Sequence, residues 1–339
     1  MNILFVTYPW DHITAETDST LRLIYECCLR GHRVGILSPN NLTIRGSITS
    51  GFCRILVPPA KLTSNFVRFH QKMQFNEQLL PLSGFDALFI RANPPLDITM
   101  LNFLDSVRDD TFIINDVDGL RKANNKLYPA TFDESLIPMT HVSKNKAYLK
   151  RIVLESKAEK MILKPFNGYG GSGVIVLEKS AESSINSLLD FYIDGKHEDN
   201  YVILQEYLDG ASAGDVRILM LNGEPIGAMK RVPAQGELRS NIHVGGEAKK
   251  YTLSKAELAL CKKIGPRLIA DGLYFVGIDI IDDKLLEVNV LSPGGIVRIN
   301  KLNRTKLEKQ VIDFVENVVT DRNQAQQRKS AFKKTVDDA

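Results

Sequence analysis

The sequence of 339 residues lacks most features that mark secreted, membrane-spanning or nucleic-acid-binding proteins. Its four cysteines form no Cys-x-x-Cys pair, which argues against a disulfide framework and favours a reducing, cytoplasmic setting. There is no run of 18 apolar residues, and no basic segment precedes the short apolar run at the start, so we expect neither a membrane span nor a signal peptide. A net charge of +3 lacks the basic excess of a dedicated nucleic-acid binder.

What is present fits a globular protein of two or three domains. Hydrophobic residues make up 44% of the chain and charged residues 24%, which are ordinary values for a folded protein. A chain of this length usually folds into more than one domain, each with its own hydrophobic core. Residues 1–115 alternate short apolar strands with helical patterns, as in a parallel sheet with crossover helices. The predicted strands are 3–6, 34–37, 87–90 and 112–114, and a helix over 21–29 is capped by Asp18-Ser19-Thr20 and ends at Gly31.

The pattern of predicted helices and strands changes after residue 115. Residues 116–123 are predicted to form a loop that leads into a helix. Later helices are predicted over 256–271 and 305–319. Residues 321–339 are polar and are predicted to fray. The predicted strands are 161–163, 174–177, 202–204, 217–220, 226–230, 274–281 and 284–290, with a turn at Asn222-Gly223.

A glycine-rich loop follows the strand at 161–163. Its residues are Gly168, Tyr169, Gly170, Gly171, Ser172 and Gly173. They match G-x-G-x-x-G, but a dinucleotide fold needs a helix after the loop, whereas Val174–Leu177 reads as a strand. We therefore expect a flap between two antiparallel strands, which could lay backbone N–H groups on phosphates or could be a plain surface hairpin. Walker and protein-kinase signatures are absent from the sequence.

Lys164 favours the phosphate interpretation of this flap. It ends the otherwise apolar segment Met161-Ile162-Leu163-Lys164-Pro165. Lysine is seldom buried without a partner, and a phosphate is a suitable one. The alternative is a lysine whose ammonium reaches solvent at the strand end.

A second candidate site lies in the hairpin near residue 280. If a loop covers residues 282–284, Asp279 faces Glu287, and strand alternation places Asn289 on the same side. Two adjacent carboxylates repel each other or bind a proton, unless a cation such as Mg²⁺ or a basic side chain neutralises them. Together with the lysine and the glycine flap, this hairpin favours nucleotide–Mg²⁺ chemistry over separate structural explanations.

In this order, the segments resemble bacterial glutathione synthetase, a family of ATP-grasp ligases. The resemblance covers nearly the whole chain. It is carried by Asp18-Ser19-Thr20, Arg91-Ala92-Asn93-Pro94-Pro95-Leu96-Asp97, Asn115-Asp116, Gly119-Leu120-Arg121, Asn125-Lys126-Leu127, Ile162-Leu163-Lys164-Pro165, Gln205 with Tyr207-Leu208, Asp215-Val216-Arg217, Arg231-Val232-Pro233, Gly236–Asn241, Gly245-Gly246, Phe275–Ile281, Glu287-Val288-Asn289 and Ser292-Pro293. It implies an α/β protein in which a Rossmann-like, parallel-sheet N-terminal domain precedes an ATP-grasp fold.

The resemblance also implies a division of the chain. Residues 1–117 would form a substrate domain, and residues 118–200 a central ATP-grasp subdomain with the flap as its lid. Residues 201–320 would form the C-terminal subdomain with the metal site. Residues 321–339 would be a disordered tail.

The activity implied by the resemblance is an ATP-dependent carboxylate–amine ligation. ATP activates γ-glutamylcysteine as an acyl phosphate, glycine attacks it, and glutathione, ADP and phosphate are released. The partners would be these small molecules, in a cytoplasmic homo-oligomer that binds neither nucleic acid nor a membrane, with Mg²⁺ or Mn²⁺ as the metal.

The resemblance assigns roles to individual residues. Lys126 and Lys164 would hold phosphates under the flap Gly168–Gly173, and Asp279, Glu287 and Asn289 would ligate the metal. Arg217 and Arg239, with Lys164, would act on the transferring phosphoryl group. Adenine would meet Gln205, Glu206, Tyr207 and Leu208. The substrate would meet Asp18, Ser19, Arg91, Arg217, Arg239, Asn241, Ser292, Gly294 and Gly295.

One departure from the family pattern follows Ser292-Pro293. The bacterial enzymes carry a Thr-Cys pair there, whereas this chain has Gly294-Gly295 and a displaced Arg298. Two glycines can bind a carboxylate through backbone N–H groups, or reshape the pocket for another amine. The alternatives to glutathione synthetase are a related ligase with different partners, a nucleotide-binding module without catalysis, and a dinucleotide oxidoreductase, which the strand after the glycine loop disfavours. Cys27 and Cys28 are predicted to be packing residues.

Overall fold

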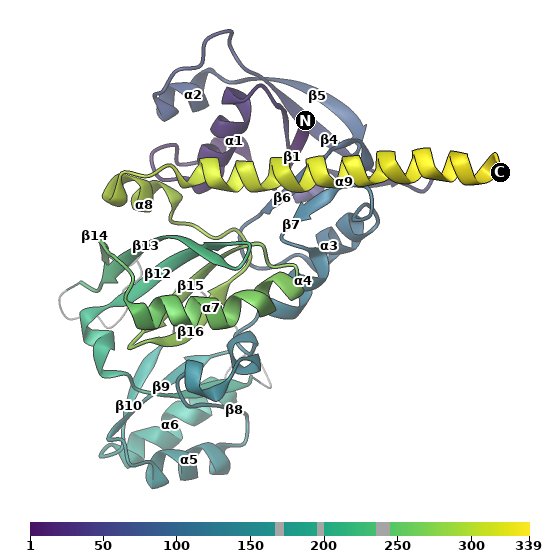
Figure 1. Ribbon diagram of the computed structural model, residues 1–339. Coiled ribbons are helices and arrows are strands. Elements are labelled where there is room, and N and C mark those ends of the chain that lie inside the picture. Colours follow the sequence, from purple (N-terminus) through teal and green to yellow (C-terminus); the bar gives the residue numbers. More distant parts are fainter. Residues whose placement is uncertain (167–172, 195–199, 235–244) are drawn as a thin grey trace. The chain divides into compact units, whose positions relative to one another are not determined.

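The computed structural model describes residues 1–166, 173–194, 200–234 and 245–339, which form two compact units (Figure 1). Unit 1 contains residues 1–121, 268–276 and 290–339, and unit 2 contains residues 122–267 and 277–289. Segments from the C-terminal third of the chain thus belong to the same unit as the N-terminus. The domain boundaries at 117, 200 and 320 stay predictions. None of the helices in the described ranges is both long and apolar enough to cross a bilayer.

Unit 1 is built on a seven-stranded mixed sheet with the order β3-β4-β2-β1-β6-β7, and β5 pairs with β4. The four parallel strands are those expected from the sequence: β1 (Asn2–Thr7), β2 (Arg33–Leu37), β6 (Ala87–Arg91) and β7 (Phe112–Ile114). They are almost wholly buried, which is why they read as continuous apolar runs. The prediction of a Rossmann-like parallel sheet is confirmed for this part of the unit.

The other three strands of unit 1 form an antiparallel extension that the sequence analysis missed. They are β3 (Leu42–Arg45), β4 (Ile48–Val57) and β5 (Gln74–Pro81), and β4 pairs with β5 over residues 50–57 and 74–81. β5 is polar and mostly exposed, and β4 contains Thr, Ser, Gly and Arg between its apolar residues. These strands therefore lack the apolar runs that mark the parallel ones.

Five helices with bounds inside unit 1 surround this sheet, and a sixth ends just beyond it. They are α1 (Ser19–Leu29), α2 (Phe66–Lys72), α3 (Ile98–Asp105), α8 (Ile296–Asn303) and α9 (Leu307–Asp337), with α4 (Val117–Ala123) at the unit boundary. Asp18 caps α1 as predicted, by accepting a hydrogen bond from Leu21 N at 2.7 Å. Arg30, just after α1, bonds Glu316 of α9 at 2.6 Å, so these helices lie side by side (Figure 1).

The prediction of a frayed tail at 321–339 is wrong, because α9 continues to Asp337. Residues 305–339 contain no glycine or proline, and the last part is rich in Ala, Gln, Lys and Arg, which favour helix. The core side of α9 ends at Val319, and every residue from 320 onward is exposed. The polar composition of residues 321–339 thus correctly predicted that they are exposed, but it wrongly predicted that they are not helical.

Unit 2 contains a four-stranded sheet of order β10-β9-β11-β8. Its strands are β8 (Thr140–Ser143), β9 (Lys160–Pro165), β10 (Ile175–Glu178) and β11 (Val202–Glu206). One face packs on α5 (Lys146–Glu155) and α6 (Glu182–Ile193), with Leu163, Leu177 and Leu204 in that core (Figure 1). β9 and β10 are antiparallel, so the prediction that the glycine loop joins two antiparallel strands is confirmed.

A five-stranded sheet of order β14-β13-β12-β15-β16 follows, in which the pairs β14–β13, β13–β12 and β15–β16 are antiparallel, and α7 (Lys255–Ala270) lies beside it (Figure 1). Its strands are β12 (Asp215–Leu221), β13 (Glu224–Val232), β14 (Glu247–Lys250), β15 (Phe275–Ile281) and β16 (Lys284–Asn289). Asn222 and Gly223 have positive φ angles, as do Asp282 and Asp283, so each hairpin turns over two residues.

Candidate active site

The β15–β16 hairpin places two carboxylates opposite each other. The two-residue turn pairs Ile281 with Lys284, and regular pairing would then set Asp279 against Leu286. Instead Leu286 is bulged, and Asp279 pairs with Glu287. The pairing expected for a loop over 282–284 is confirmed, but the turn covers Asp282 and Asp283 alone, and a β-bulge makes the one-residue shift.

The β12–β13 hairpin also contains a β-bulge that shifts its register by one residue. Its register shifts at Leu219, so that Asp215 pairs with Arg231 rather than with Lys230. The Arg231 guanidinium donates two hydrogen bonds of 2.6 Å to the Asp215 carboxylate, and both side chains are buried. The sequence analysis assigned no role to Asp215 or Arg231 beyond the family motif. Strand alternation and the Asn222-Gly223 turn indicated the face of the sheet on which Asp215 lies. No clear feature of the sequence indicated the bulge that brings Arg231 opposite Asp215.

Two arginines hold Asp279, which is 4% exposed. Arg217 binds it through Nε and Nη2, the latter at 2.8 Å from Oδ2, and Arg231 Nη2 lies 3.0 Å from Oδ1. Asn289 Nδ2 donates to Oδ2 at 3.2 Å. Burial alone would raise the pKa of Asp279, but the two guanidinium charges outweigh it and hold the pKa well below its usual value. Asp279 is therefore ionised at neutral pH.

Glu287 has the opposite environment. Burial and the negative charge of Asp279 raise its pKa, against the opposing charges of Arg217 and two lysines. Within the described ranges no group donates a hydrogen bond to its carboxylate. Glu287 and Asn289 share a face with Asp279, so three oxygen-bearing side chains point the same way. This all-oxygen set suits a hard divalent cation, which would relieve the repulsion between the carboxylates.

The two lysines come from the other half of unit 2. Lys164 Nζ donates to Gln205 Oε1 at 2.6 Å, and Lys126 Nζ donates to the carbonyl of Pro165 at 2.8 Å. Burial lowers the pKa of Lys164 to about 8 and also lowers the pKa of Lys126, while the charge of Glu287 opposes both shifts. The lysines and Glu287 are thus close enough to interact electrostatically. Both lysines bond neutral oxygens, which leaves their positive charge available to an anion.

The face that carries Lys164 also carries apolar side chains. Strand pairing places Ile162, Val176 and Ile203 on the side opposite to the helix-packed core. Ile162 and Val176 are only partly buried. A half-open apolar surface beside two lysines matches the needs of a nucleotide, whose base is flat and apolar and whose phosphates are anionic.

The predicted adenine-contacting residues follow this face at the end of β11. Glu206 exchanges two hydrogen bonds with Met139: its backbone N–H donates at 2.9 Å, and its carboxylate accepts at 3.1 Å. Tyr207 and Leu208 are partly exposed.

In unit 1, the predicted substrate residues form a separate cluster at the carboxyl ends of β1 and β6. The strand order reverses between these strands, which is where parallel α/β sheets bind ligands. Arg91 is 3% exposed; its Nε donates to Thr20 Oγ1 at 3.0 Å, and both Nη atoms donate to Pro293 O at 3.1 Å. Burial lowers the pKa of Arg91, while the nearby charge of Asp18 raises it. Arg91 is thus a buried cation whose hydrogen-bond partners within the described residues are neutral.

The same cluster includes the glycine pair. Gly295 N donates to Ser19 Oγ at 3.2 Å, and Ser292 Oγ donates to Arg91 O at 3.3 Å. Gly295 has φ of 122°, which a residue with a side chain rarely adopts. Gly294 is exposed, and a Cβ there would meet no atom within 4 Å.

Asp18 of this cluster has a partner that the sequence analysis missed. The Tyr8 hydroxyl hydrogen-bonds Asp18, and burial together with the Asp18 charge raises the pKa of Tyr8. The available signal was that Tyr8 lies two residues after the end of the predicted strand 3–6.

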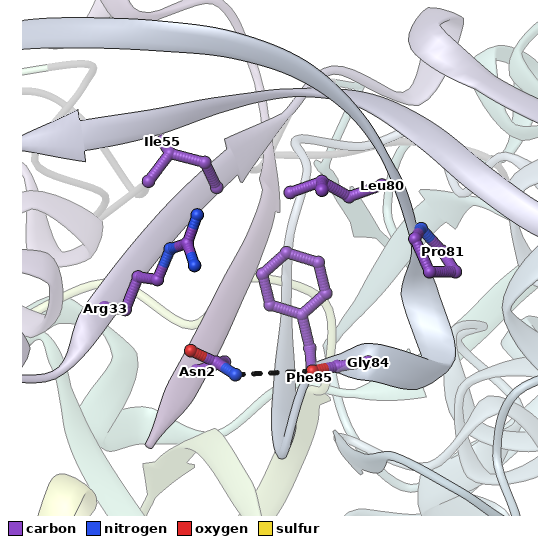
Figure 2. A pocket seen from close by; sticks show the side chains of 7 residues that line it. All are labelled: Asn2, Arg33, Ile55, Leu80, Pro81, Gly84 and Phe85. Atoms are coloured by element: carbon purple, nitrogen blue, oxygen red, sulfur yellow. Dashed lines mark hydrogen bonds between the residues drawn. The ribbon is translucent and has the colours of Figure 1, made fainter.

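A cavity of about 180 Å³ in unit 1 is distinct from this cluster (Figure 2). Its lining residues are Asn2, Arg33, Ile55, Leu80, Pro81, Gly84 and Phe85. Asn2 and Arg33 begin β1 and β2, so the cavity lies at the amino ends of strands whose carboxyl ends carry the cluster. We therefore do not assign it to the candidate site.

Several predicted residues lie outside the described ranges: Gly168, Tyr169, Gly170, Gly171, Ser172, Arg239 and Asn241. Gly173 is described. Its carbonyl accepts a hydrogen bond from the Tyr192 hydroxyl at 2.9 Å, and a Cβ would lie 2.9 Å from Pro165 Cγ. Gly173 thus packs against Pro165 at the end of β9.

The fold and the paired lysine and carboxylate sites define an ATP-grasp ligase. Three similar solved structures each have a TM-score of 0.59. They are D-cycloserine synthetase DcsG (15% identity, 91% of this chain and 99% of that one), a RimK domain ATP-grasp protein from Sphaerobacter thermophilus (16%, 93% and 99%) and macrocyclase MdnC from Microcystis aeruginosa (15%, 94% and 100%). At these identities they show the fold.

The chain belongs to the prokaryotic glutathione synthetase family. Residues 1–121 match the family's N-terminal domain and residues 125–304 its ATP-grasp domain. The glutathione synthetase of Synechocystis sp. is 33% identical over 325 residues, which cover 93% of this chain and 99% of the relative. That of Thermosynechococcus vestitus is 35% identical over 323 residues, with the same coverage. These relatives support glutathione synthetase function, an ATP-dependent ligation, for this chain.

Proposed function

We propose that the chain joins γ-glutamylcysteine to glycine, with unit 2 holding ATP and the metal. The observation that carries this assignment is the charge arrangement of unit 2. Among the described residues, Lys126 and Lys164 donate to neutral oxygens, while Asp279 and Glu287 face each other on the adjoining sheet. One part of the cluster therefore suits phosphates and the other a cation.

The nucleotide would bind along the apolar face of the four-stranded sheet. Ile162 and Val176 offer a surface for the adenine ring, and Glu206, Tyr207 and Leu208 offer backbone groups at its edge. The two lysines would bind the phosphates as fixed positive charges. The flap around Gly168–Gly173 would cover them, and exclusion of water would protect an acyl phosphate from hydrolysis.

Glu287, Asn289 and Asp279 would hold the metal, which we propose to be Mg²⁺ or Mn²⁺. All three donors are oxygens on one strand-pair face, which both ions accept. A bound divalent cation neutralises charge on phosphate oxygens. Comparing nucleotide affinity in Mg²⁺ and Mn²⁺ distinguishes the two ions.

The reaction then needs charge stabilisation and positioning rather than a protein nucleophile. An oxygen of the donor carboxylate forms a bond to the γ-phosphorus of ATP, and the bond to the ADP oxygen breaks. The glycine nitrogen then bonds the acyl carbon, phosphate leaves, and the nitrogen loses its proton. Arg217, which neutralises Asp279 in the structure, and Arg239 would stabilise the negative charge on the transferring phosphoryl group.

The unit 1 cluster would bind substrate. A buried Arg91 with neutral partners suits a carboxylate, and the backbone N–H of Gly294, beside Gly295, suits a second one. Asp18 offers a negative charge for an ammonium group. Ser19, Ser292 and Asn241 would complete the contacts. The open space beside Gly294 also favours a related ligase with a larger amine as the second candidate.

Product analysis tests the proposal. Purified protein is incubated with ATP, Mg²⁺ and γ-glutamylcysteine, with glycine replaced in turn by alanine, serine and β-alanine, and ADP and peptide products are quantified. Glycine-dependent ADP release with formation of glutathione is expected. ADP release that another amine supports better than glycine would identify the second candidate. Nucleotide binding without turnover for any pair would leave a binding module.

We further propose a cytoplasmic homo-oligomer, on the resemblance to bacterial enzymes. Light scattering on the purified chain measures its mass directly, and a mass of 37.9 kDa would contradict the oligomer.

A further inference from the structure

A relay of three hydrogen bonds ends at the ammonium group of Lys164. Thr140 Oγ1 donates to Pro138 O at 2.7 Å, and Gln205 Nε2 donates to Thr140 Oγ1 at 2.8 Å. Lys164 Nζ then donates to Gln205 Oε1 at 2.6 Å. The relay therefore crosses three adjacent strands, from β8 through β11 to β9.

The sheet register aligns these side chains. Gln205 lies directly opposite Thr140, and Lys164 lies opposite Ile203, two residues before Gln205. All three polar side chains thus lie on the apolar nucleotide-facing side of the sheet, away from the α5–α6 core. Gln205 is 6% exposed, so its amide has little access to water as a substitute partner.

The chemistry of each group fixes the direction of the relay. A carbonyl oxygen only accepts, so the single Thr140 proton is used on Pro138, and Thr140 can only accept from Gln205. The amide nitrogen of Gln205 must therefore face Thr140, and its amide oxygen must face Lys164. An ammonium group only donates, so this orientation satisfies every link, whereas the flipped amide would set donor against donor.

We propose that Gln205 is a positioning residue that acts on the nucleotide phosphates through Lys164, with Thr140 fixing its amide. This inference rests on the proposed phosphate-binding role of Lys164. It differs from the prediction that Gln205 contacts adenine, because both ends of its amide are already engaged within the protein. A neutral oxygen holds the ammonium in place while leaving its charge for the phosphate; a carboxylate would cancel that charge.

Binding measurements on the whole chain separate these roles. ADP and adenosine are each titrated, with Mg²⁺ present, in competition with a fluorescent ADP analogue. The variants are Gln205→Met, Gln205→Glu, Thr140→Val, Thr140→Ser and Lys164→Met. Thr111→Val is the matched control, because it removes a buried hydroxyl that also donates to backbone carbonyls, in unit 1. Thermal unfolding monitors folding.

Gln205→Met is expected to weaken ADP binding roughly tenfold, the loss of about one charged hydrogen bond, while adenosine affinity stays within about twofold. Gln205→Glu weakens ADP binding at least as much. Thr140→Val weakens it less, and Thr140→Ser restores it. In the Lys164→Met background, Gln205→Met has no further effect on ADP affinity, since both act through one group.

Three results decide the matter. Equal losses of adenosine and ADP affinity in Gln205→Met would overturn the proposal in favour of direct base contact. Unchanged ADP affinity in both Gln205→Met and Thr140→Val would also overturn it, even if Lys164→Met binds weakly, and the proposed function would survive. Unchanged ADP affinity in Lys164→Met would overturn the phosphate role itself. If Gln205→Met does not fold, the Thr140 pair gives the same decision.

Discussion

Glu287 lies opposite Asp279 because Leu286 is bulged out of β16. The two carboxylates have different partners: Asp279 is bound by Arg217 and Arg231, and within the described residues nothing donates to Glu287. A metal would therefore find one carboxylate fixed in place and one available to it.

We expect Glu287→Gln to remove most of the metal-dependent part of nucleotide binding. The amide keeps the shape but not the charge, so ADP affinity in Mg²⁺ should fall roughly tenfold or more, while affinity in EDTA changes little. Isothermal titration with and without the metal measures both. Glu178→Gln is the control, since Glu178 pairs with Lys160 in an exposed position. Equal metal enhancement in wild type and Glu287→Gln would remove Glu287 from the site.

Nucleotide affinity should fall as the pH rises through about 8. The pKa of Lys164 is lowered to about 8, so above this value the folded free protein loses the positive charge that the phosphates need. Lys164→Arg stays charged and should show a flatter profile. The same shift should make the nucleotide-free protein gain stability between about pH 8 and the ordinary lysine value near 10.4, because the unfolded chain binds the proton more tightly there. A wild-type ADP affinity independent of pH from 7 to 9.5 would contradict this assignment.

Removing one partner of the Asp215–Arg231 ion pair should lower the free energy of unfolding more than replacing both partners does, relative to the number of residues changed. Asp215→Asn takes from Arg231 one of its two carboxylate partners, and Arg231→Met takes the guanidinium from both Asp215 and Asp279, so each should destabilise unit 2 by about 3 kcal/mol. The double variant should be less destabilised than the sum of the two, since both act on one interaction. Urea unfolding, followed by a probe in unit 2, measures the coupling. Strict additivity would show that the pair does not act as a unit.

All four cysteines should resist thiol reagents in the folded protein. Cys27, Cys28, Cys53 and Cys261 are buried and unpaired, and burial raises the pKa of Cys28, Cys53 and Cys261 to about 12. A thiol that stays protonated at pH 8 is a poor nucleophile. Labelling with a chromogenic disulfide should modify fewer than one thiol at first and four in urea. Fast native labelling would contradict the packing role.

Removing the exposed end of α9 should have little effect on stability. Truncation after Asn323 leaves the buried residues up to Val319 and the bond from Arg322 to Asp109 O intact. The unfolding temperature should therefore change by no more than roughly 2 °C. Truncation after Lys306 removes Val311, Ile312 and Val315 and should unfold unit 1. A large loss of stability on truncation after Asn323 would indicate that the exposed turns of α9 have a binding partner in solution.

The sequence was sufficient where one residue's chemistry decides the outcome. Asp18 predicted the start of α1, buried apolar runs predicted the parallel strands, and the strand after the glycines predicted the antiparallel flap. Contacts that depend on register were harder. Arg231 could not be placed against Asp215, nor Thr140 against Gln205, because those pairings depend on a bulge and on strands far apart in the chain. β4 and β5 were missed because their polar residues hide the strand pattern.

The two bulges also affect how this chain tolerates change. Loss of one uncharged residue from β13 between the turn and Arg231, or from β16 between the turn and Glu287, would remove the bulge and leave regular pairing, in which Arg231 still faces Asp215 and Glu287 still faces Asp279. Gain of one residue would instead need a second irregularity, because regular pairing after the present bulge would turn the charged side chain to the opposite side of the sheet. Single-residue insertions in these two short segments should therefore be tolerated less well than single-residue deletions.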